Sequence, residues 1–576
     1  LVSSFVFFLY AAHLVLLLSF RWQRQIVIRD SFTSSQFLSN KRDVQGMATT
    51  STKSHAATKL HTSAQMMAQP LLISDLIEYA ANHHGQKKII SQRLEGDIHS
   101  YSYQEALQRS KRLANALLAL GVEEGDRIGT LAWNGYRHFE CYYGISGIGA
   151  ICHTINPRLY AEQIEYIIQH AEDSYLFVDA CFIKLLEPIA DRLISVKGII
   201  VLIDADQMPT SSLNNLINYE ELLAEQDEQI VWPNLDADSA ACLCYTSGTT
   251  GNPKGVLYSH RSTVMHAYAS RNPDALNISV DTIVMPVVPM YHVCAWGVPY
   301  IAPMSGATLV LPGDGMDGEN LYQLIDYAKV NLMLGVPTVW LGLIDYLKEK
   351  NLIIPSVKTV GVGGAASPRS LVETLDKDYG IYLLPIWGMT ETSPLATLGS
   401  RNNALEQLPD DERYAIQTSA GKPMFGIDIE IFDEDTNLPL KHDGKARGLL
   451  RVRGPWVLSS YYKSDKTDCF VEDQQGRVWF DTGDIATIDQ DSYLRIVDRA
   501  KDVVKSGGEW ISSIDLENSA LGCDGVTEAC VIGVKHEKWD ERPLLFIVRQ
   551  NEGLEKETIY QFLTDKIAKW WMPDDI

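Results

Sequence analysis

The segment YTSGTTGNPKG, from Tyr245 to Gly255, combines hydroxyl side chains, glycines and a single lysine. Backbone N–H groups of a glycine-rich loop can converge on an anion, and Thr and Ser hydroxyls and a lysine ammonium add further donors. The P-loop of nucleotide triphosphatases has glycine directly before its lysine, whereas Pro253 precedes Lys254 here. The pattern therefore predicts a phosphate-binding loop that departs from the P-loop; the alternative is an ordinary polar turn.

Two acidic motifs downstream suggest what the phosphate belongs to. In WGMTE, the ring of Trp387 can stack on adenine, and Glu391 can hold a Mg²⁺ ion that bridges the phosphates of ATP. In FDTGD, Asp484 follows a predicted strand and can accept hydrogen bonds from both ribose hydroxyls, with Arg499 as a second nucleotide contact. Taken singly, these motifs also fit a core tryptophan beside a capped helix, a surface turn and a salt bridge.

Two further segments could serve a second substrate. The stretch MYHVCAWG places His292 and Trp296 among apolar residues, where ordinary core packing is the alternative for both. The segment KSGGEW carries Lys505, which can meet a phosphate or a carbonyl group, and the glycines let the backbone approach a ligand closely.

The stretch GVGGAA, residues 361–366, has the G-x-G-x-x-A spacing of a dinucleotide-binding fingerprint. An NAD-dependent enzyme would need an acidic residue at the end of the next strand. The next predicted strand, IYLLPIW, instead runs directly into GMTE. The sequence therefore disfavours an oxidoreductase.

The elements that carry these motifs alternate between short apolar runs and amphipathic stretches. LLISDLIEYAANHH predicts a helix capped by Ser74 or Asp75, and DRIGTLAW, SYLFVDA, NLMLGVP and KTVGVGG predict buried strands. This alternation predicts an α/β protein with layered, mainly parallel sheets. After Gly421 the pattern changes to antiparallel strands, and after Arg499 to a small α+β unit with a hairpin in ACVIGVKHEKWDERPLLFIVRQ.

Composition restricts the partners. The chain has 576 residues, enough for at least two domains, and a formal net charge of −23, so a nucleic-acid partner that binds through clustered Lys and Arg is not expected. None of its nine cysteines forms a C-x-x-C pair, which indicates buried or unpaired thiols in a reducing compartment.

The N-terminal region of 69 residues forms a separate leader. Residues 1–20 are almost continuously apolar and have the length of a membrane span or signal anchor. The following stretch from Met47 is rich in Ser, Thr and Ala and lacks acidic residues, as organelle-targeting segments often do. A disordered leader, a targeting peptide and a membrane anchor all remain open, as do a cytoplasmic, a mitochondrial and a peroxisomal location.

Together, YTSGTTGNPKG, VGVGGAASP, WGMTETSP, FDTGD and DRAKDVVKSGGEWISSIDLE resemble, in order, the motifs of the adenylate-forming superfamily. The resemblance extends from about Leu72 to Ile576, and HTINPRL, VPMYHVCAWGVPY and WISSIDLEN are most similar to medium- and long-chain fatty acyl-CoA synthetases and methylthiopropionate ligases. It implies a large N-terminal domain, residues 70–498, of α/β sheets with a distorted β-barrel. It also implies a small mobile α+β C-terminal domain, residues 499–576.

The resemblance assigns roles to individual residues. It implies that ATP and AMP are bound by Thr246, Ser247, Gly248, Thr249, Thr250, Lys254, Gly364, Ala365, Trp387, Gly388, Met389, Thr390, Glu391, Asp484 and Arg499. It places Mg²⁺ on Thr246 and Glu391, and the acyl substrate against His292, Trp296, Gly363 and Gly364. It places CoA on Lys505, Gly507, Gly508, Glu509 and Trp510. Lys254, His292, Glu391 and Lys505 are the implied catalytic residues, and Lys501 is the implied hinge.

The implied reaction has two halves: a carboxylate and ATP form acyl-AMP and pyrophosphate, and the CoA thiol then displaces AMP. A medium- to long-chain fatty acid is the first substrate expected, with methylthiopropionate and then an aromatic acid as alternatives. The resemblance also implies a homodimer, while membrane contact through residues 1–20 stays open. The family's C-terminal glycine-lysine motif does not occur before Ile576, so we expect a truncated C-terminal domain, and a nucleotide-binding fragment with impaired adenylation is a second hypothesis.

Overall fold

The computed structural model describes residues 66–246, 252–506, 509–536, 538–550, 553–564 and 566–576. Residues Leu71–Ile576 form one compact unit. The apolar segment 1–20, the tip of the predicted phosphate loop at 247–251 and the glycines at 507 and 508 lie outside the described residues. Within the described ranges, no helix has both the length and the apolar character needed to cross a bilayer.

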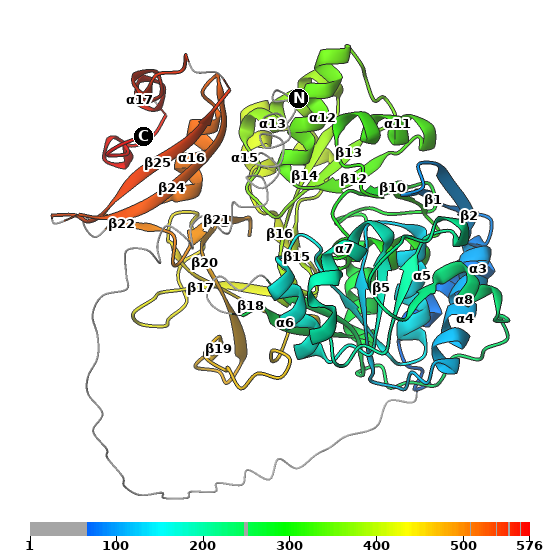
Figure 1. Cartoon of the computed structure of the whole chain (residues 1–576). Coiled ribbons are helices and arrows are strands. Elements are labelled where there is room, and N and C mark those ends of the chain that lie inside the picture. The colour runs from blue at the N-terminus through cyan, green and yellow to red at the C-terminus, as the bar shows by residue number, and fades with distance from the viewer. Residues whose placement is uncertain (1–65, 247–251, 507–508, 537, 551–552, 565) are drawn as a thin grey trace, which may run out of the picture. The chain divides into compact units, whose positions relative to one another are not determined.

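The first sheet has seven strands in the order β7-β6-β5-β3-β4-β8-β9. Its strand β5 is labelled in Figure 1. All neighbouring pairs are parallel except β8 and β9, which form an antiparallel hairpin. The strands are β3 (Arg127–Leu131), β4 (Ile151–Thr154), β5 (Tyr175–Asp179), β6 (Gly198–Leu202), β7 (Leu216–Asn218), β8 (Ala240–Thr246) and β9 (Lys254–Ser259).

The second sheet has nine strands in the order β16-β15-β14-β13-β12-β10-β11-β1-β2. Its central strands are parallel, and β2, β15 and β16 at the two edges are antiparallel to their neighbours. The strands are β1 (Lys88–Gln92), β2 (Ile98–Ser102), β10 (Ile283–Pro286), β11 (Thr308–Leu311), β12 (Leu332–Gly335), β13 (Thr359–Val362), β14 (Tyr382–Gly388), β15 (Leu395–Leu398) and β16 (Lys422–Pro423). The two mainly parallel sheets confirm the predicted α/β class.

Two antiparallel sheets follow in the sequence. In the region predicted to be antiparallel after Gly421, where a distorted β-barrel was expected, a five-stranded sheet is formed by β17 (Asp428–Phe432), β18 (Gly448–Arg453), β20 (Val478–Ile488), β19 (Phe470–Glu472) and β21 (Leu494–Arg499), which pairs with β20. The last sheet contains β23 (Glu509–Ile511), β22 (Val504–Ser506), β25 (Asp540–Arg549) and β24 (Val526–His536). The predicted hairpin is therefore the pair β24 and β25.

Fifteen α-helices lie in the described ranges, and local sequence explains where several of them start. Helix α4 begins after Ser102, whose hydroxyl accepts from the Glu105 backbone while the Glu105 carboxylate accepts from the Ser102 backbone. The predicted cap of α3 is wrong, because the helix begins after Leu72 with no side-chain cap. The helices are α3 (Ile73–His84), α4 (Tyr103–Ala119), α5 (Tyr136–Gly147), α6 (Ala161–Ala171), α7 (Ile183–Leu186), α8 (Tyr219–Ala224), α9 (His260–Ser270), α10 (Val298–Ser305), α11 (Gly318–Ala328), α12 (Pro337–Lys350), α13 (Arg369–Tyr379), α14 (Asn403–Glu406), α15 (Asp410–Gln417), α16 (Ser513–Leu521) and α17 (Lys556–Thr564).

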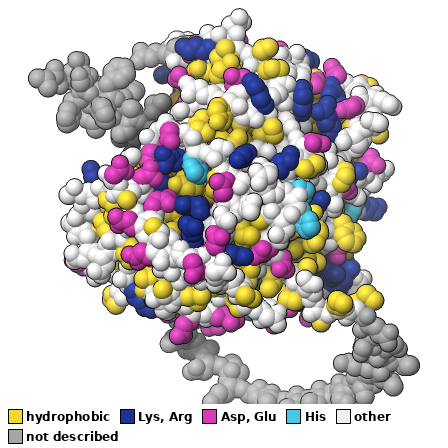
Figure 2. Space-filling model, turned by 90° about the vertical axis from the view of Figure 1, so that its right-hand side faces the viewer, with side chains coloured by type: hydrophobic (Ala, Val, Ile, Leu, Met, Phe, Trp, Pro, Cys, Tyr) yellow, Lys and Arg dark blue, Asp and Glu magenta, His cyan; other side chains and the backbone are white. Residues whose placement is uncertain are grey.

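The largest hydrophobic core joins α4 and α5 to strands of both parallel sheets and to the segment 293–304. Because the same cluster contains residues of β8, β14 and β18, it fixes the ends of these strands relative to one another. On the face shown in Figure 2, acidic and basic side chains alternate and exposed apolar side chains occur in small groups.

Candidate active site

The β8–β9 hairpin presents the predicted phosphate loop. Thr246, the last residue of β8, lies opposite Lys254, the first residue of β9. The Lys254 ammonium lies 4.5 Å from the centroid of the Tyr461 ring, a cation–π contact. The predicted contacts Ser247, Gly248, Thr249 and Thr250 fall outside the described residues.

Glu391 lies in the short helix η5 (Thr390–Thr392), directly after β14. Its side chain is buried, with 6% of the residue exposed, and its Oε1 accepts a 2.8 Å hydrogen bond from the Tyr461 hydroxyl. Burial raises the pKa of Glu391, while the Tyr461 bond and the charges of Arg499 and Lys254 oppose that rise. A carboxylate in this position gains strongly from a nearby cation.

The backbone around η5 is held by contacts from distant segments. The Tyr258 hydroxyl donates to the Thr390 carbonyl oxygen at 2.7 Å, and the Leu458 N–H donates to the Glu391 carbonyl oxygen at 2.9 Å. At Gly388 an added Cβ would lie 2.0 Å from the Pro394 carbonyl oxygen, so only glycine fits where β14 meets this turn.

The Asp484–Arg499 pair forms on the five-stranded sheet, where the two residues lie opposite each other on β20 and β21. Their side chains form a 2.9 Å ion pair, and Asp484 is 3% exposed. Burial raises the pKa of Asp484 to about 6, against the opposing effects of Arg499 and of a hydrogen bond from Trp387. The structure thus connects Trp387 on β14 to Asp484.

The predicted acyl-binding residues lie on two neighbouring segments. Trp296 belongs to the turn η4 (Val293–Gly297), and its ring lies 3.0 Å from where a Cβ on Gly363 would stand. Gly364 has a φ of +77° and lies beside Val336, and Ala365 next to it is exposed. Trp296 is therefore packed against the 363–364 backbone.

His292 precedes this turn and its side chain is exposed. Protein atoms nevertheless crowd the ring, and the resulting desolvation lowers the pKa of His292. A position of His292 beside the acyl substrate remains a prediction.

The structure does not bring Lys505 to the nucleotide-binding residues. Its side chain, on β22, forms a 3.7 Å ion pair with Glu434 instead of one with Glu391, and its backbone lies opposite Trp510 on β23. Glu509 shares β23, and Lys501 lies exposed in the turn between β21 and β22.

Sequence reasoning missed Tyr461, which contacts both Lys254 and Glu391. Tyr461 lies 70 residues after Glu391, in a loop with no motif of its own. The doublet Tyr461–Tyr462 was the available signal, and nothing in its spacing pointed to the site.

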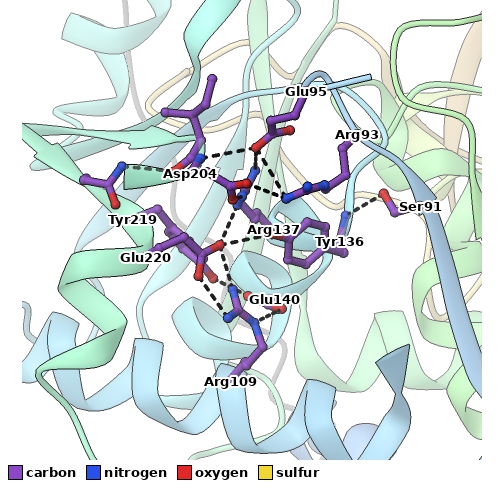
Figure 3. Close-up of polar contacts among 12 residues, drawn as sticks. Ser91, Arg93, Glu95, Arg109, Tyr136, Arg137, Glu140, Asp204, Tyr219 and Glu220 are labelled. Carbon is purple, nitrogen blue, oxygen red and sulfur yellow. Dashed lines mark hydrogen bonds and ion pairs between the residues drawn. The ribbon is translucent and has the colours of Figure 1, made fainter. Parts of the chain in front are cut away.

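A second polar cluster lies between α4, α5 and α8 (Figure 3). Arg137 pairs with Glu95 and with Glu220 at 2.7 Å each, and Arg109 pairs with Glu140 at 2.7 Å and with Glu220 at 3.0 Å. The adjoining cavity has a volume of about 30 Å³, room for water and not for a nucleotide. These ion pairs link α4, α5 and α8 to one another.

Comparison with known proteins identifies the class. The family model described as AMP-binding enzyme matches residues 77–462, and that of the AMP-binding enzyme C-terminal domain matches residues 515–576. The fold is similar to that of an anthranilate CoA ligase solved with anthranoyl-AMP, with a TM-score of 0.76, 21% identity, and 88% of this chain and 94% of that chain covered.

Curated relatives agree. A 3-methylmercaptopropionyl-CoA ligase from Ruegeria lacuscaerulensis is 46% identical, covering 89% of this chain and 94% of its own. A medium-chain-fatty-acid–CoA ligase from Ectopseudomonas oleovorans is 43% identical, and a long-chain-fatty-acid–CoA ligase from Thermus thermophilus 40%, each covering 88% of this chain and 92% of its own.

The chain belongs to the AMP-binding enzyme family. It is an AMP-forming acid–thiol ligase, an acyl-CoA synthetase, for which the family implies ATP and CoA as substrates. Because residues 515–576 match the C-terminal domain, the comparisons do not support the prediction that this domain is truncated or the ligase impaired.

Proposed function

We propose that the enzyme activates an aliphatic monocarboxylic acid, first of all a medium- to long-chain fatty acid. The observation that carries this proposal is the apolar character of the side chains that pack around the Gly363–Gly364 backbone, those of Trp296, Val336 and Ile386. An alkyl chain gains about 0.8 kcal/mol for each methylene buried against such a surface. The relatives named as medium- and long-chain fatty acid ligases support the same class.

In the first half-reaction, the side chains around Glu391 neutralise the negative charge of the ATP phosphates. Lys254, at the start of β9 with its ammonium over the Tyr461 ring, stabilises the leaving pyrophosphate. Asp484 accepts from the ribose hydroxyls, and Arg499 and Trp387 hold its carboxylate in place. The Trp387 face offers a surface for adenine.

The residues fit a Mg²⁺ ion. Mg²⁺ prefers oxygen ligands, and the proposed ligands are the Glu391 carboxylate and the Thr246 hydroxyl. Glu391 is buried and desolvation raises its pKa, so a bound cation offsets the cost of keeping the carboxylate ionised. When bound, Mg²⁺ neutralises charge on the phosphates. Tyr461 holds one Glu391 oxygen and thereby orients the carboxylate.

The second half-reaction requires another set of residues around the acyl-AMP. Lys505 and Trp510, with the neighbouring Gly507, Gly508 and Glu509, are the proposed CoA contacts. Lys501, in the exposed turn before β22, is the proposed hinge for the rotation that brings them in. We expect Lys501→Pro to slow thioester formation far more than acyl-AMP formation; an equal loss in both half-reactions would argue against a hinge at this residue.

A short thioether acid such as methylthiopropionate is the second candidate. The packing of the Trp296 ring against the Gly363 backbone favours it, because a closed ring limits how deep the acyl chain can extend. Two relatives named as 3-methylmercaptopropionyl-CoA ligases give it further support.

A chain-length panel separates the two candidates. Pyrophosphate release would be measured with CoA over straight-chain acids of increasing length, methylthiopropionate and benzoate. The fatty-acid proposal predicts a kcat/KM that rises with each methylene added through medium lengths. A maximum at methylthiopropionate would select the second candidate, and a maximum at benzoate would refute both. Trp296→Ala should shift the optimum to longer acids, whereas Trp296→Phe should shift it less.

A further inference from the structure

Three cysteine thiols meet beside the acyl-binding segment. Cys242 and Cys244 lie two residues apart on β8 and face the same side of the strand, and Cys294 lies on η4. The Cys242 and Cys294 sulfurs are 3.2 Å apart, and each lies 3.8 to 3.9 Å from the Cys244 sulfur. All three residues are at most 2% exposed and belong to the largest hydrophobic core.

The segment that carries Cys294 is strained. Val293, Cys294, Ala295 and Trp296 have φ values of 43°, 53°, 48° and 55°. Left-handed backbone costs an L-residue other than glycine roughly 1–2 kcal/mol, so the surrounding contacts must hold this turn in place. Cys294 packs against β8 and Trp296 packs against Gly363, so the turn is held on both sides.

Oxidation fits this cluster better than metal binding. The described residues supply these three sulfurs as a possible metal-binding group. A metal would require thiolates, and a tris-thiolate complex of a monovalent or divalent cation keeps net negative charge in an apolar core. A disulfide is neutral. Its bond length of about 2.05 Å requires the 3.2 Å pair to close by only about 1.2 Å.

We propose that Cys242 and Cys294 are a peroxide-sensitive thiol pair whose oxidation ties the 293–297 turn to β8 and slows acyl-CoA formation. Hydrogen peroxide oxidises one thiol to a sulfenic acid and releases water. The second thiol then attacks the sulfenic sulfur, forms the S–S bond and releases a second water. A dithiol reductant reverses the reaction. Closing the pair displaces the turn that positions Trp296, and a displacement of about 1 Å in an active site can cost on the order of 100-fold in rate.

The test uses the purified full chain, exposed to hydrogen peroxide and then denatured for thiol counting. We expect the nine thiols to fall by two and to recover after dithiothreitol. Trypsin should release a cross-linked pair formed by the peptide that ends at Lys254 and the peptide that begins at Asn272. This readout does not depend on which carboxylate is the substrate. Acyl-CoA synthesis should fall by about 10- to 100-fold in parallel with the cross-link.

Four single variants test which two cysteines form the disulfide. Cys242→Ser and Cys294→Ser should abolish the cross-link. After peroxide treatment, each variant should retain the activity that it had before treatment. Cys244→Ser should retain the cross-link, as should Cys181→Ser, which removes an exposed thiol far from the cluster in sequence. A cross-link through Cys244 in the wild-type chain would overturn the pairing. A cross-link without loss of activity would overturn the effect on catalysis. Stoichiometric metal with unreactive thiols in the purified protein would overturn the proposal in favour of a metal site.

Discussion

The Tyr461 hydroxyl donates the hydrogen bond that favours the ionised form of Glu391. Tyr461→Phe removes the 2.8 Å hydrogen bond to Glu391 and leaves the ring beneath the Lys254 ammonium. A hydrogen bond to a charged group contributes about 1.5–3 kcal/mol. That energy corresponds to about a 10- to 100-fold change in the equilibrium that keeps Glu391 ionised.

The direction in which Tyr461→Phe shifts the pH dependence of activity follows from the opposing effects on the pKa of Glu391. Burial already raises the pKa of Glu391, and the Tyr461 bond opposes that rise. Removing the bond therefore raises the pKa further, so more of the enzyme is protonated at a given acidic pH. The acid limb of activity should move to higher pH, and the Mg²⁺ concentration for half-maximal activity should rise.

ATP–pyrophosphate exchange measures the first half-reaction alone and should be recorded against pH and Mg²⁺. Tyr462→Phe is the matched control, because the neighbouring ring contacts His170 and not Glu391. In Glu391→Gln, which should itself lose about 10²- to 10³-fold in rate, adding Tyr461→Phe should cause little further change. If Tyr461→Phe lowers the rate equally at every pH and Mg²⁺ concentration, the reasoning about Glu391 is wrong.

Three other perturbations test the site and its support. Asp484→Asn should abolish the rise in KM for ATP that we expect below about pH 6, where the wild-type carboxylate takes up a proton and its ion pair weakens; an unchanged KM–pH profile would count against this assignment. Gly388→Ala should destabilise the fold by about 2–4 kcal/mol in urea unfolding, since its Cβ would lie 2.0 Å from a carbonyl oxygen, and wild-type stability would disprove the steric argument. Arg137→Ala should cost about 3–5 kcal/mol in the same assay because the buried Glu95 carboxylate loses its 2.7 Å partner and keeps Arg93 at 3.8 Å, whereas Arg261→Ala, at an exposed pair, should leave the unfolding midpoint unchanged.

The sequence was sufficient for the fold class and for naming the residues that are proposed to form the site. Strands alternate with helices along the chain, and period-2 and period-3.6 patterns are local, so the parallel sheets and the β24–β25 hairpin could be predicted. The motifs around Lys254, Glu391 and Asp484 predicted nucleotide binding, because their residue types and their order along the chain are specific to that function. The cap of α3 was mispredicted since two good capping residues lie inside the first turn of the helix.

Tertiary structure decided how these residues act together. The bond between Tyr461 and Glu391 spans 70 residues, and the contact between Cys244 and Cys294 spans 50. No local pattern encodes such distances, because strand order and loop paths set them. The left-handed turn at 293–296 is also invisible in the sequence, since none of its four residues favours that conformation. The sequence by itself determined the kind of chemistry, and packing decided which side chains hold Glu391, Asp484 and Trp296 in place.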